Sequence, residues 1–277
     1  MAVGQSTLEQ PLRGLRGAFD EMIRFFEKTA AITEIEIRKL SHDPLELFTR
    51  AVQPMLWLLV FGQVFTQIRA IPTGDLRYLD FMTPGILAQS VLFVAIFYGI
   101  AVIWERDLGI LHKFLVSPTP RIALVLGKAL SASVRGLSQA AIVFLLALVM
   151  GVAINWNPVA MLGVLLAVIL GAAFFSTFSL ILASFLKTRE RFMGIGQVLT
   201  MPLFFASNAI YPTAIMPTWL QAVAHVNPLS YEVDALRGLM LVNGVSVFGI
   251  GTDFAVLVLA TAIAVVVGAR VYPRVVI

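Results

Sequence analysis

The sequence of 277 residues has no cysteine, few histidines and no phosphate-binding loop, and each shortage excludes a class of function. Without cysteine there is no disulfide framework, no thiolate metal site and no cysteine nucleophile. The three histidines stand far apart without metal-ligand spacing, so we expect no metal site. Because Gly127-Lys128 is followed by Ala129 and lacks the upstream glycine of a Walker motif, we predict that the chain is not itself an ATPase.

Charge is also scarce, and apolar residues take its place. Charged residues make up 13% of the chain and hydrophobic residues 59%, and the mean hydropathy is +0.90, which is typical of a membrane protein that crosses the bilayer several times. We therefore predict an all-α membrane protein with six transmembrane helices. The predicted spans are residues 45–65, 81–104, 123–152, 159–185, 192–209 and 253–269.

The segment before the first span is amphipathic. Apolar residues recur there at helical spacing, at Phe19, Met22, Ile23, Phe26 and Ala30. We predict an interfacial helix on the inner leaflet and no cleavable signal, because no apolar core follows the first basic residues. The chain then divides into a cytoplasmic segment, residues 1–44, and a six-span permease domain, residues 45–277.

The basic residues predict the orientation of the spans. With the N-terminus inside, 16 Lys and Arg fall on the inner side and three, Arg69, Arg77 and Arg237, on the outer side, with Arg135 set aside as embedded. Both termini are therefore expected in the cytoplasm. The net charge of +4 fits this bias, so we expect no nucleic-acid partner.

A charged interval from Glu105 to Arg121 separates the second and third apolar runs. Within it Leu108, Leu111 and Leu115 follow helical spacing, with Phe114 beside them, and Ser117-Pro118-Thr119-Pro120 ends the pattern. This short amphipathic helix is suited to docking in a groove on a soluble partner. The same apolar stripe could instead rest on lipid headgroups, and periodicity does not separate the two interpretations.

The third run carries a polar stripe. Arg121, Lys128 and Arg135 are seven residues apart, and Ser138 and Gln139 lie on the same side. Such a face could line a substrate route, to which we also assign Asn208 at the end of the fifth run. Alternatively, Arg135 sits near the interface and snorkels. In the fourth run, the spacing of Ala167 and Gly171 indicates close helix packing.

Residues 207–252 are too long and too apolar for a simple external loop. Pro212, Pro217 and Pro228 divide the segment, and residues 218–226 read as a short helix capped by Thr218, with Trp219 on its apolar face and Asn227 after it. We predict that this segment re-enters the membrane and covers a cavity from outside. It could also lie flat on the outer interface.

Several motifs together resemble one known family, the permeases of type 2 ATP-binding-cassette exporters, including those of the daunorubicin-resistance kind. The resemblance covers nearly the whole chain. It rests on His42-Asp43-Pro44, Gln53-Pro54, Glu105-Arg106-Asp107-Leu108-Gly109, Ser117-Pro118, Gly127-Lys128, Asn208-Ala209-Ile210-Tyr211-Pro212, Met216-Pro217-Thr218-Trp219-Leu220 and Asn227-Pro228-Leu229-Ser230-Tyr231 through Arg237. Ile110 departs from the threonine that the family often has after the glycine, but the apolar stripe survives.

The resemblance implies a permease that exports an amphiphile such as a drug or lipid across an inner (plasma) membrane of bacterial type. It implies two permease subunits, most simply a homodimer in membrane lipid, and two separate nucleotide-binding subunits that hold ATP and Mg. The contact with those subunits would be made by Glu105, Leu108, Leu111, Phe114 and Leu115.

Other functions remain open at this point. A polysaccharide or glycolipid exporter permease has the same features. An ion-coupled secondary transporter would need carboxylates near the middle of the membrane. We expect the candidates Glu46, Asp80, Glu105, Glu232 and Asp253 at span ends or outside.

Overall fold

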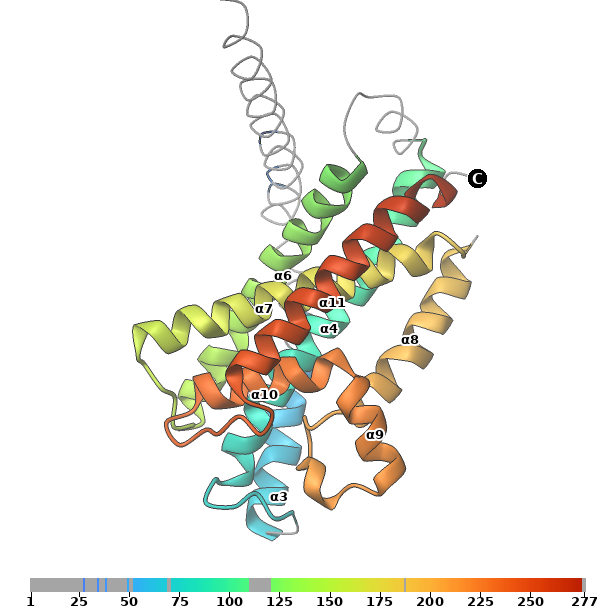
Figure 1. The fold of residues 1–277 in the computed structure, drawn as a ribbon. Helices are drawn as coiled ribbons and strands as arrows, with labels where there is room; N and C mark the ends of the chain where they lie inside the picture. Colours follow the sequence, from blue (N-terminus) through green and yellow to red (C-terminus); the bar gives the residue numbers. More distant parts are fainter. Residues whose placement is uncertain are drawn as a thin grey trace, which may run out of the picture.

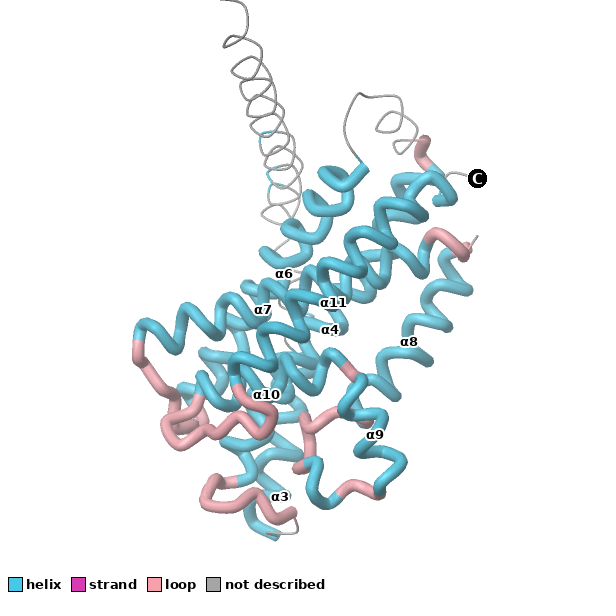
Figure 2. The backbone as a smooth tube through the Cα atoms, in the orientation of Figure 1, coloured by secondary structure: helices cyan, strands magenta, loops and turns pink. Residues whose placement is uncertain are grey.

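The computed structural model describes residues 27, 34, 38, 49, 52–68, 71–109, 121–186 and 188–275. These residues form helices joined by turns and loops, and no strand occurs among them (Figure 2). The predicted all-α class is therefore confirmed. The predicted interfacial helix around residues 19–30 lies outside the described residues, except for Glu27.

Four helices are long and apolar enough to cross a membrane. They are α4 (Tyr78–Asp107), α6 (Arg121–Val149), α7 (Pro158–Ala183) and α11 (Ile250–Val271), which continues into the short 3-10 helix η3 (Tyr272–Val275). At a rise of about 1.5 Å per residue, each can cover a hydrocarbon core of about 30 Å. The second, third, fourth and sixth predicted spans are thus helices of spanning length.

The predicted first span is described continuously only from residue 52, and the predicted fifth span is a shorter helix. Residues 52–68 form an apolar helix that contains the π-helical stretch η1 (Trp57–Gly62) and ends in α3 (Gln63–Ile68). The fifth, α8 (Arg189–Phe205), has 17 residues. Seventeen residues extend only about 25 Å as α-helix, so the count of six spans stays a prediction.

The segment after α8 folds into three short helices, η2 (Thr213–Ile215), α9 (Thr218–Val226) and α10 (Pro228–Met240). The predicted helix over residues 218–226 is confirmed at both ends, but Pro217 occupies its N-cap and no side chain caps it, so the prediction that Thr218 caps it is wrong. By contrast, the Asn227 side chain caps α10 by accepting from Leu229 N (3.1 Å), and Pro228 occupies its first turn.

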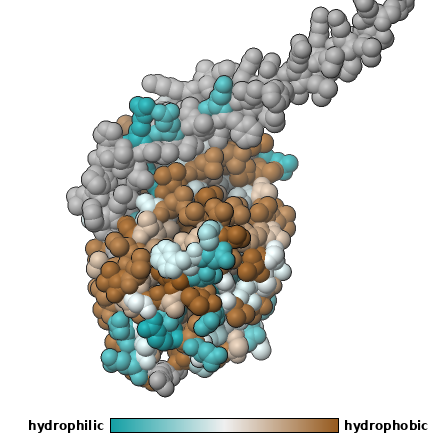
Figure 3. Space-filling model, turned by 90° about the vertical axis from the view of Figure 1, so that its left-hand side faces the viewer, coloured by the Kyte–Doolittle hydropathy of each residue, from teal (hydrophilic) through white to brown (hydrophobic). Residues whose placement is uncertain are grey.

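The centre of the molecule is α4, which packs against α6, α7, α8, α10 and the helix before it (Figure 1). The buried core includes Ile86 and Ile96 of α4, Phe175 of α7 and Leu236 of α10. On the face in Figure 3, apolar residues dominate the middle, and hydrophilic ones gather toward the upper and lower edges. That distribution suits helices that stand in a bilayer.

Basic side chains gather at one end of the bundle, where α4 and α11 finish and α6 and α8 begin. We call this the basic end. Its described members are Arg106, Arg121, Arg189, Arg191, Arg270 and Arg274. At the opposite end, Arg77 is exposed, and Asp80 accepts hydrogen bonds from its Nε and Nη2 (2.9 Å each). That carboxylate raises the pKa of the Arg77 guanidinium.

Candidate functional site

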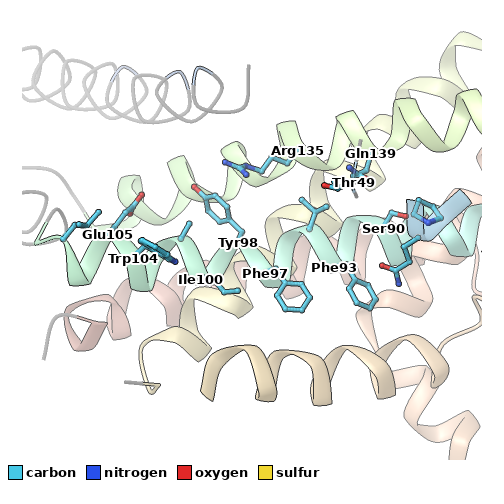
Figure 4. Close-up of a pocket in the computed structure, with 15 residues that line it drawn as sticks. Thr49, Ser90, Phe93, Phe97, Tyr98, Ile100, Trp104, Glu105, Arg135 and Gln139 are labelled. Carbon is cyan, nitrogen blue, oxygen red and sulfur yellow. The ribbon is translucent and has the colours of Figure 1, made fainter. Parts of the chain in front are cut away.

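A cavity of about 870 Å³ lies beside α4, with Thr49, Gln53 and Pro54 on one side and α6 on the other (Figure 4). One part of its wall is aromatic or aliphatic, formed by Phe93, Phe97, Tyr98, Ile100 and Trp104. The other part is polar, formed by Thr49, Gln53, Ser90, Arg135 and Gln139. An amphiphilic molecule could therefore bind with its apolar body on one wall and its polar group on the other.

Helical geometry explains how these walls arise. Phe93, Phe97, Ile100 and Trp104 follow an i, i+4, i+7, i+11 pattern, which places them on one face of α4. This aromatic stripe was missed in the sequence analysis, although the same spacing test would have found it. It was missed because the apolar stretch of α4 has few polar residues, so the sequence did not show which face of the helix borders a cavity.

Helix α6 contributes Arg135 and Gln139 to the polar part of the wall, one turn apart. The Arg135 guanidinium lies 5.2 Å from the centre of the Tyr98 ring, within cation–π range. Gln139 is 1% exposed, and neither its side-chain nitrogen nor its oxygen has a hydrogen-bond partner among the described residues. Two of the residues predicted to line a substrate route, Arg135 and Gln139, therefore lie in the wall of this cavity.

The other two residues assigned to that route lie elsewhere. Ser138 does not line this cavity, and its hydroxyl donates to the Arg135 carbonyl (2.7 Å). Asn208 is buried at the opposite end of the bundle, where it lines a second cavity of about 440 Å³ with Phe81 and Arg237. The structure therefore divides three of the four residues between two separate cavities, both bordered by α4, and leaves Ser138 out of both.

At the basic end, a buried ion pair joins α4 to α6. Lys128 Nζ donates a hydrogen bond to Glu105 Oε2, and both residues are at least nine-tenths buried. Tyr272, at the end of α11, is fully buried in the same region and packs with Val102 and Leu124. Glu105 therefore faces the bundle, not a partner surface. Leu108 is 66% exposed, and Leu111, Phe114 and Leu115 lie outside the described residues.

A second ionic cluster joins the end of α4 to the start of α8. Asp107 pairs with Arg106 (3.0 Å) and with Arg189 (2.9 Å), and the Arg189 guanidinium lies 3.5 Å from the centre of the Trp104 ring. Arg106 Nη1 also donates to the carbonyl of Leu186 (3.2 Å). The end of α4 is thus held to the start of α8 and to the loop between α7 and α8.

The residues predicted to form the re-entrant segment lie in different parts of the structure. Pro212 borders the second cavity, Pro217 precedes α9, and Trp219 is 67% exposed on α9. Asn227 is buried, and its Nδ2 donates to the carbonyls of Leu203 (2.7 Å) and Ala206 (3.2 Å). Asn227 and Pro228 thereby fix the start of α10 to the end of α8.

Helix α10 carries charged residues into the bundle, which corrects one expectation. Glu232 was expected at a span end or outside, but it is fully buried where α10 packs against α7. Arg237, counted on the outer side, is also buried. Its Nη2 donates to the Asn208 carbonyl (2.6 Å), and its guanidinium lies 3.8 Å from the centre of the Phe81 ring. Sequence periodicity missed both because α10 is short and was not recognised as a packed helix.

Two aspartates form a hydrogen-bonded group beside Arg237. Asp234 accepts from Phe248 N (2.8 Å) and from Asn208 Nδ2 (3.3 Å), and Ser246 Oγ lies 3.0 Å from Asp234 and 2.8 Å from Asp253. This group fastens the loop after α10 to the first turn of α11. Among the residues that the structure describes, no three acidic or histidine side chains are grouped so that they could hold a metal ion.

Comparison with known proteins identifies the family. Residues 27–241 match the family model described as ABC-2 type transporter. The ycf38 protein of Cyanophora paradoxa, named as a transport permease, is 32% identical over 207 residues, which are 73% of this chain and 70% of that protein. The daunorubicin resistance ABC transporter permease protein DrrB1 of Streptomyces coeruleorubidus is 26% identical over 83% of this chain and 81% of its own.

The inner membrane transport permease YadH of Escherichia coli K12 is also similar, with 24% identity over 75% of this chain and 80% of its own. The matched region of the family model ends just after α10, so it includes the cavity beside α4 and the ionic clusters at the end of α4. The helices of spanning length and the permease relatives agree with this match. The chain belongs to the ABC-2 type transporter family, as a transmembrane permease subunit.

Proposed function

We propose that this permease exports an amphiphile, such as a drug or a lipid, across an inner (plasma) membrane of bacterial type. The cavity beside α4 carries the proposal, because its aromatic wall and its polar wall with Arg135 and Gln139 suit a molecule that has an apolar body and a polar group. The name of DrrB1 refers to resistance to daunorubicin, a compound that serves as a probe of this substrate class.

The proposed orientation places the basic end in the cytoplasm, since Lys and Arg accumulate on the cytoplasmic side of membrane proteins. Both termini would then be cytoplasmic. The cavity extends along α4 as far as Glu105 and Leu108, close to this end. A substrate could thus enter from the cytoplasm or the inner leaflet and leave past Asn208 and α9 on the outer side.

The energy would come from separate nucleotide-binding subunits that hold ATP and Mg, because this sequence has no phosphate-binding loop. Two copies of the permease, as a homodimer, would pair with two such subunits. We propose that Leu111, Phe114 and Leu115 dock on the ATPase subunit. Glu105 would act indirectly, because its pair with Lys128 passes movement from that junction to α6.

The proposal is tested with inside-out vesicles that contain the permease and the ATPase subunit encoded beside it. We expect ATP-dependent accumulation of daunorubicin. Phe97→Ala should lower it several-fold by removing part of the aromatic wall, while Phe185→Ala, at an exposed aromatic residue outside the cavity, should leave it near normal. No ATP-dependent transport of any amphiphilic probe, or equal effects of the two substitutions, would contradict the proposal.

A further inference from the structure

Glu232 differs from the other buried acidic residues of the molecule. It is 0% exposed, and neither of its carboxyl oxygens has a hydrogen-bond partner among the described residues. The other buried carboxylates are engaged, Glu105 with Lys128, Asp80 with Arg77, and Asp234 and Asp253 with Ser246. A buried ionised carboxylate without a partner is costly, so the unpaired position favours the neutral acid.

The contact surface on α7 gives this carboxyl group no charge to pair with. The carboxyl group of Glu232 lies against Gly171. A Cβ atom added to Gly171 would come within 2.2 Å of Cδ and 2.3 Å of both oxygens of Glu232. A Cβ atom there would displace the carboxyl group from this position. The whole of α7, from Pro158 to Ala183, contains no ionisable side chain. The glycine predicted to serve helix packing therefore receives an acidic side chain.

The remaining ionisable groups near this end of the bundle have partners of their own. α10 packs against α4, α7, α9 and α11. On these helices and on α10 itself, the ionisable groups at this end of the bundle are Asp80 on α4, His225 on α9, Tyr231, Asp234 and Arg237 on α10, and Asp253 on α11. Arg237 donates to the carbonyls of Asn208 and Phe81, and His225 Nδ1 lies 2.6 Å from the Gln221 carbonyl. Tyr231 donates to the His225 carbonyl (2.7 Å).

We propose that Glu232 is a proton-binding site whose occupancy is set by the packing of α10 on α7. While the helices are in contact, the carboxyl group keeps its proton. When they separate and water reaches the group, its O–H bond breaks, the proton passes to water and a carboxylate remains. No other reactant is required.

This inference rests on the proposed function for its role in transport. If the permease opens to the outer side by moving α10 away from α7, each opening releases one proton per subunit at Glu232, and each closing takes one up. Export would then slow as the outer solution becomes more acidic, because excess protons favour the closed packing. The energy still comes from the ATPase partner, and the proton adjusts the balance between the two states.

Infrared spectroscopy of the full chain in lipid vesicles tests the protonation directly, since a protonated carboxyl group has a carbonyl band distinct from that of a carboxylate. At neutral pH, we expect the wild type to show a protonated-carboxyl band that Glu232→Gln loses. Glu190→Gln, at an exposed residue of α8, is the matched control and should retain it. An unchanged band in Glu232→Gln would overturn the proposal.

A cross-link tests the link to helix packing without changing residue 232. The chain has no cysteine, and a Cβ atom on Gly163 of α7 would lie 2.7 Å from the Leu239 side chain of α10. In the Gly163→Cys/Leu239→Cys variant, we expect the oxidised form to keep the carboxyl band to higher pH than the reduced form. Identical titrations of the two forms would overturn the proposal. Neither measurement needs transport. If both measurements contradict the proposal about Glu232, the exporter proposal is unaffected, and if no transport is found, both measurements still test the protonation of Glu232.

Discussion

Two regions of this permease bury acidic side chains in opposite ways. At the basic end, the buried Glu105 is paired with Lys128. Where α10 enters the bundle, Glu232 lies against Gly171 and has no partner among the described residues. The comparison teaches that a buried ion pair joins α4 to α6, while the contact of Glu232 with α7 has no opposite charge beside it.

The physical reason is the cost of taking an ion out of water. A buried ion pair recovers that cost through its partner, so the loss of one member leaves the other charge uncompensated. A lone carboxyl group avoids the cost by keeping its proton. The basic end should therefore be sensitive to substitution, and the contact between α10 and α7 should be sensitive to pH and to steric change.

The largest effect is expected from Lys128→Met. It removes the ammonium group that neutralises the buried Glu105 carboxylate, which should lower the free energy of unfolding in detergent by about 3–5 kcal/mol at neutral pH. The control is Glu105→Leu/Lys128→Met, which replaces both charges by apolar groups and should recover most of the loss. If the double variant is as unstable as the single one, the pair does not stabilise this end through its charge.

A smaller effect is expected from Gly171→Ala, which places a methyl group against the Glu232 carboxyl group. Overpacking of this kind should cost about 1–3 kcal/mol of unfolding free energy. The cost should shrink in a Glu232→Ala background, where the space is free. Gly194→Ala in α8 is the control, because nothing lies within 4 Å of its added Cβ atom, and equal losses at both glycines would contradict the contact.

The smallest effect is expected from Arg189→Ala, which removes the pair with Asp107 and the contact with Trp104. Both partners are partly exposed, so water and salt screen the interaction, and the loss should be about 1 kcal/mol and fall as salt is added. Arg191→Ala, at an exposed residue of the same helix, should change the unfolding free energy less. A loss at Arg189 that does not depend on salt would mean that packing on Trp104 dominates.

Part of the fold follows from local pattern alone. The side chains of long apolar runs must be buried in protein or lie in lipid, and their backbone groups must be hydrogen-bonded within the run. For this reason the four helices of spanning length could be located within a few residues. The helix at residues 218–226 could be predicted equally well, since prolines lie on both sides of it. The ends of α8 could not, because an apolar run does not reveal where its helix ends.

The candidate site was predicted less completely. Spacing on α6 correctly placed Arg135 and Gln139 on one face, and the structure brings both to the cavity beside α4. Asn208 belongs to a different cavity, because the chain turns at the opposite end of the bundle before α10. No local pattern carries that information, since a cavity is defined by residues from several helices.

The sequence by itself determined the helical class, the long helices, the basic bias of the chain and the amphipathic stripe after α4, because these depend on the order of residues along one segment. Only the tertiary structure decided that Lys128 pairs with Glu105 and that Glu232 meets Gly171. Whether a charge is paired or alone depends on which helix lies opposite it. Helix packing sets that arrangement between residues far apart in the chain.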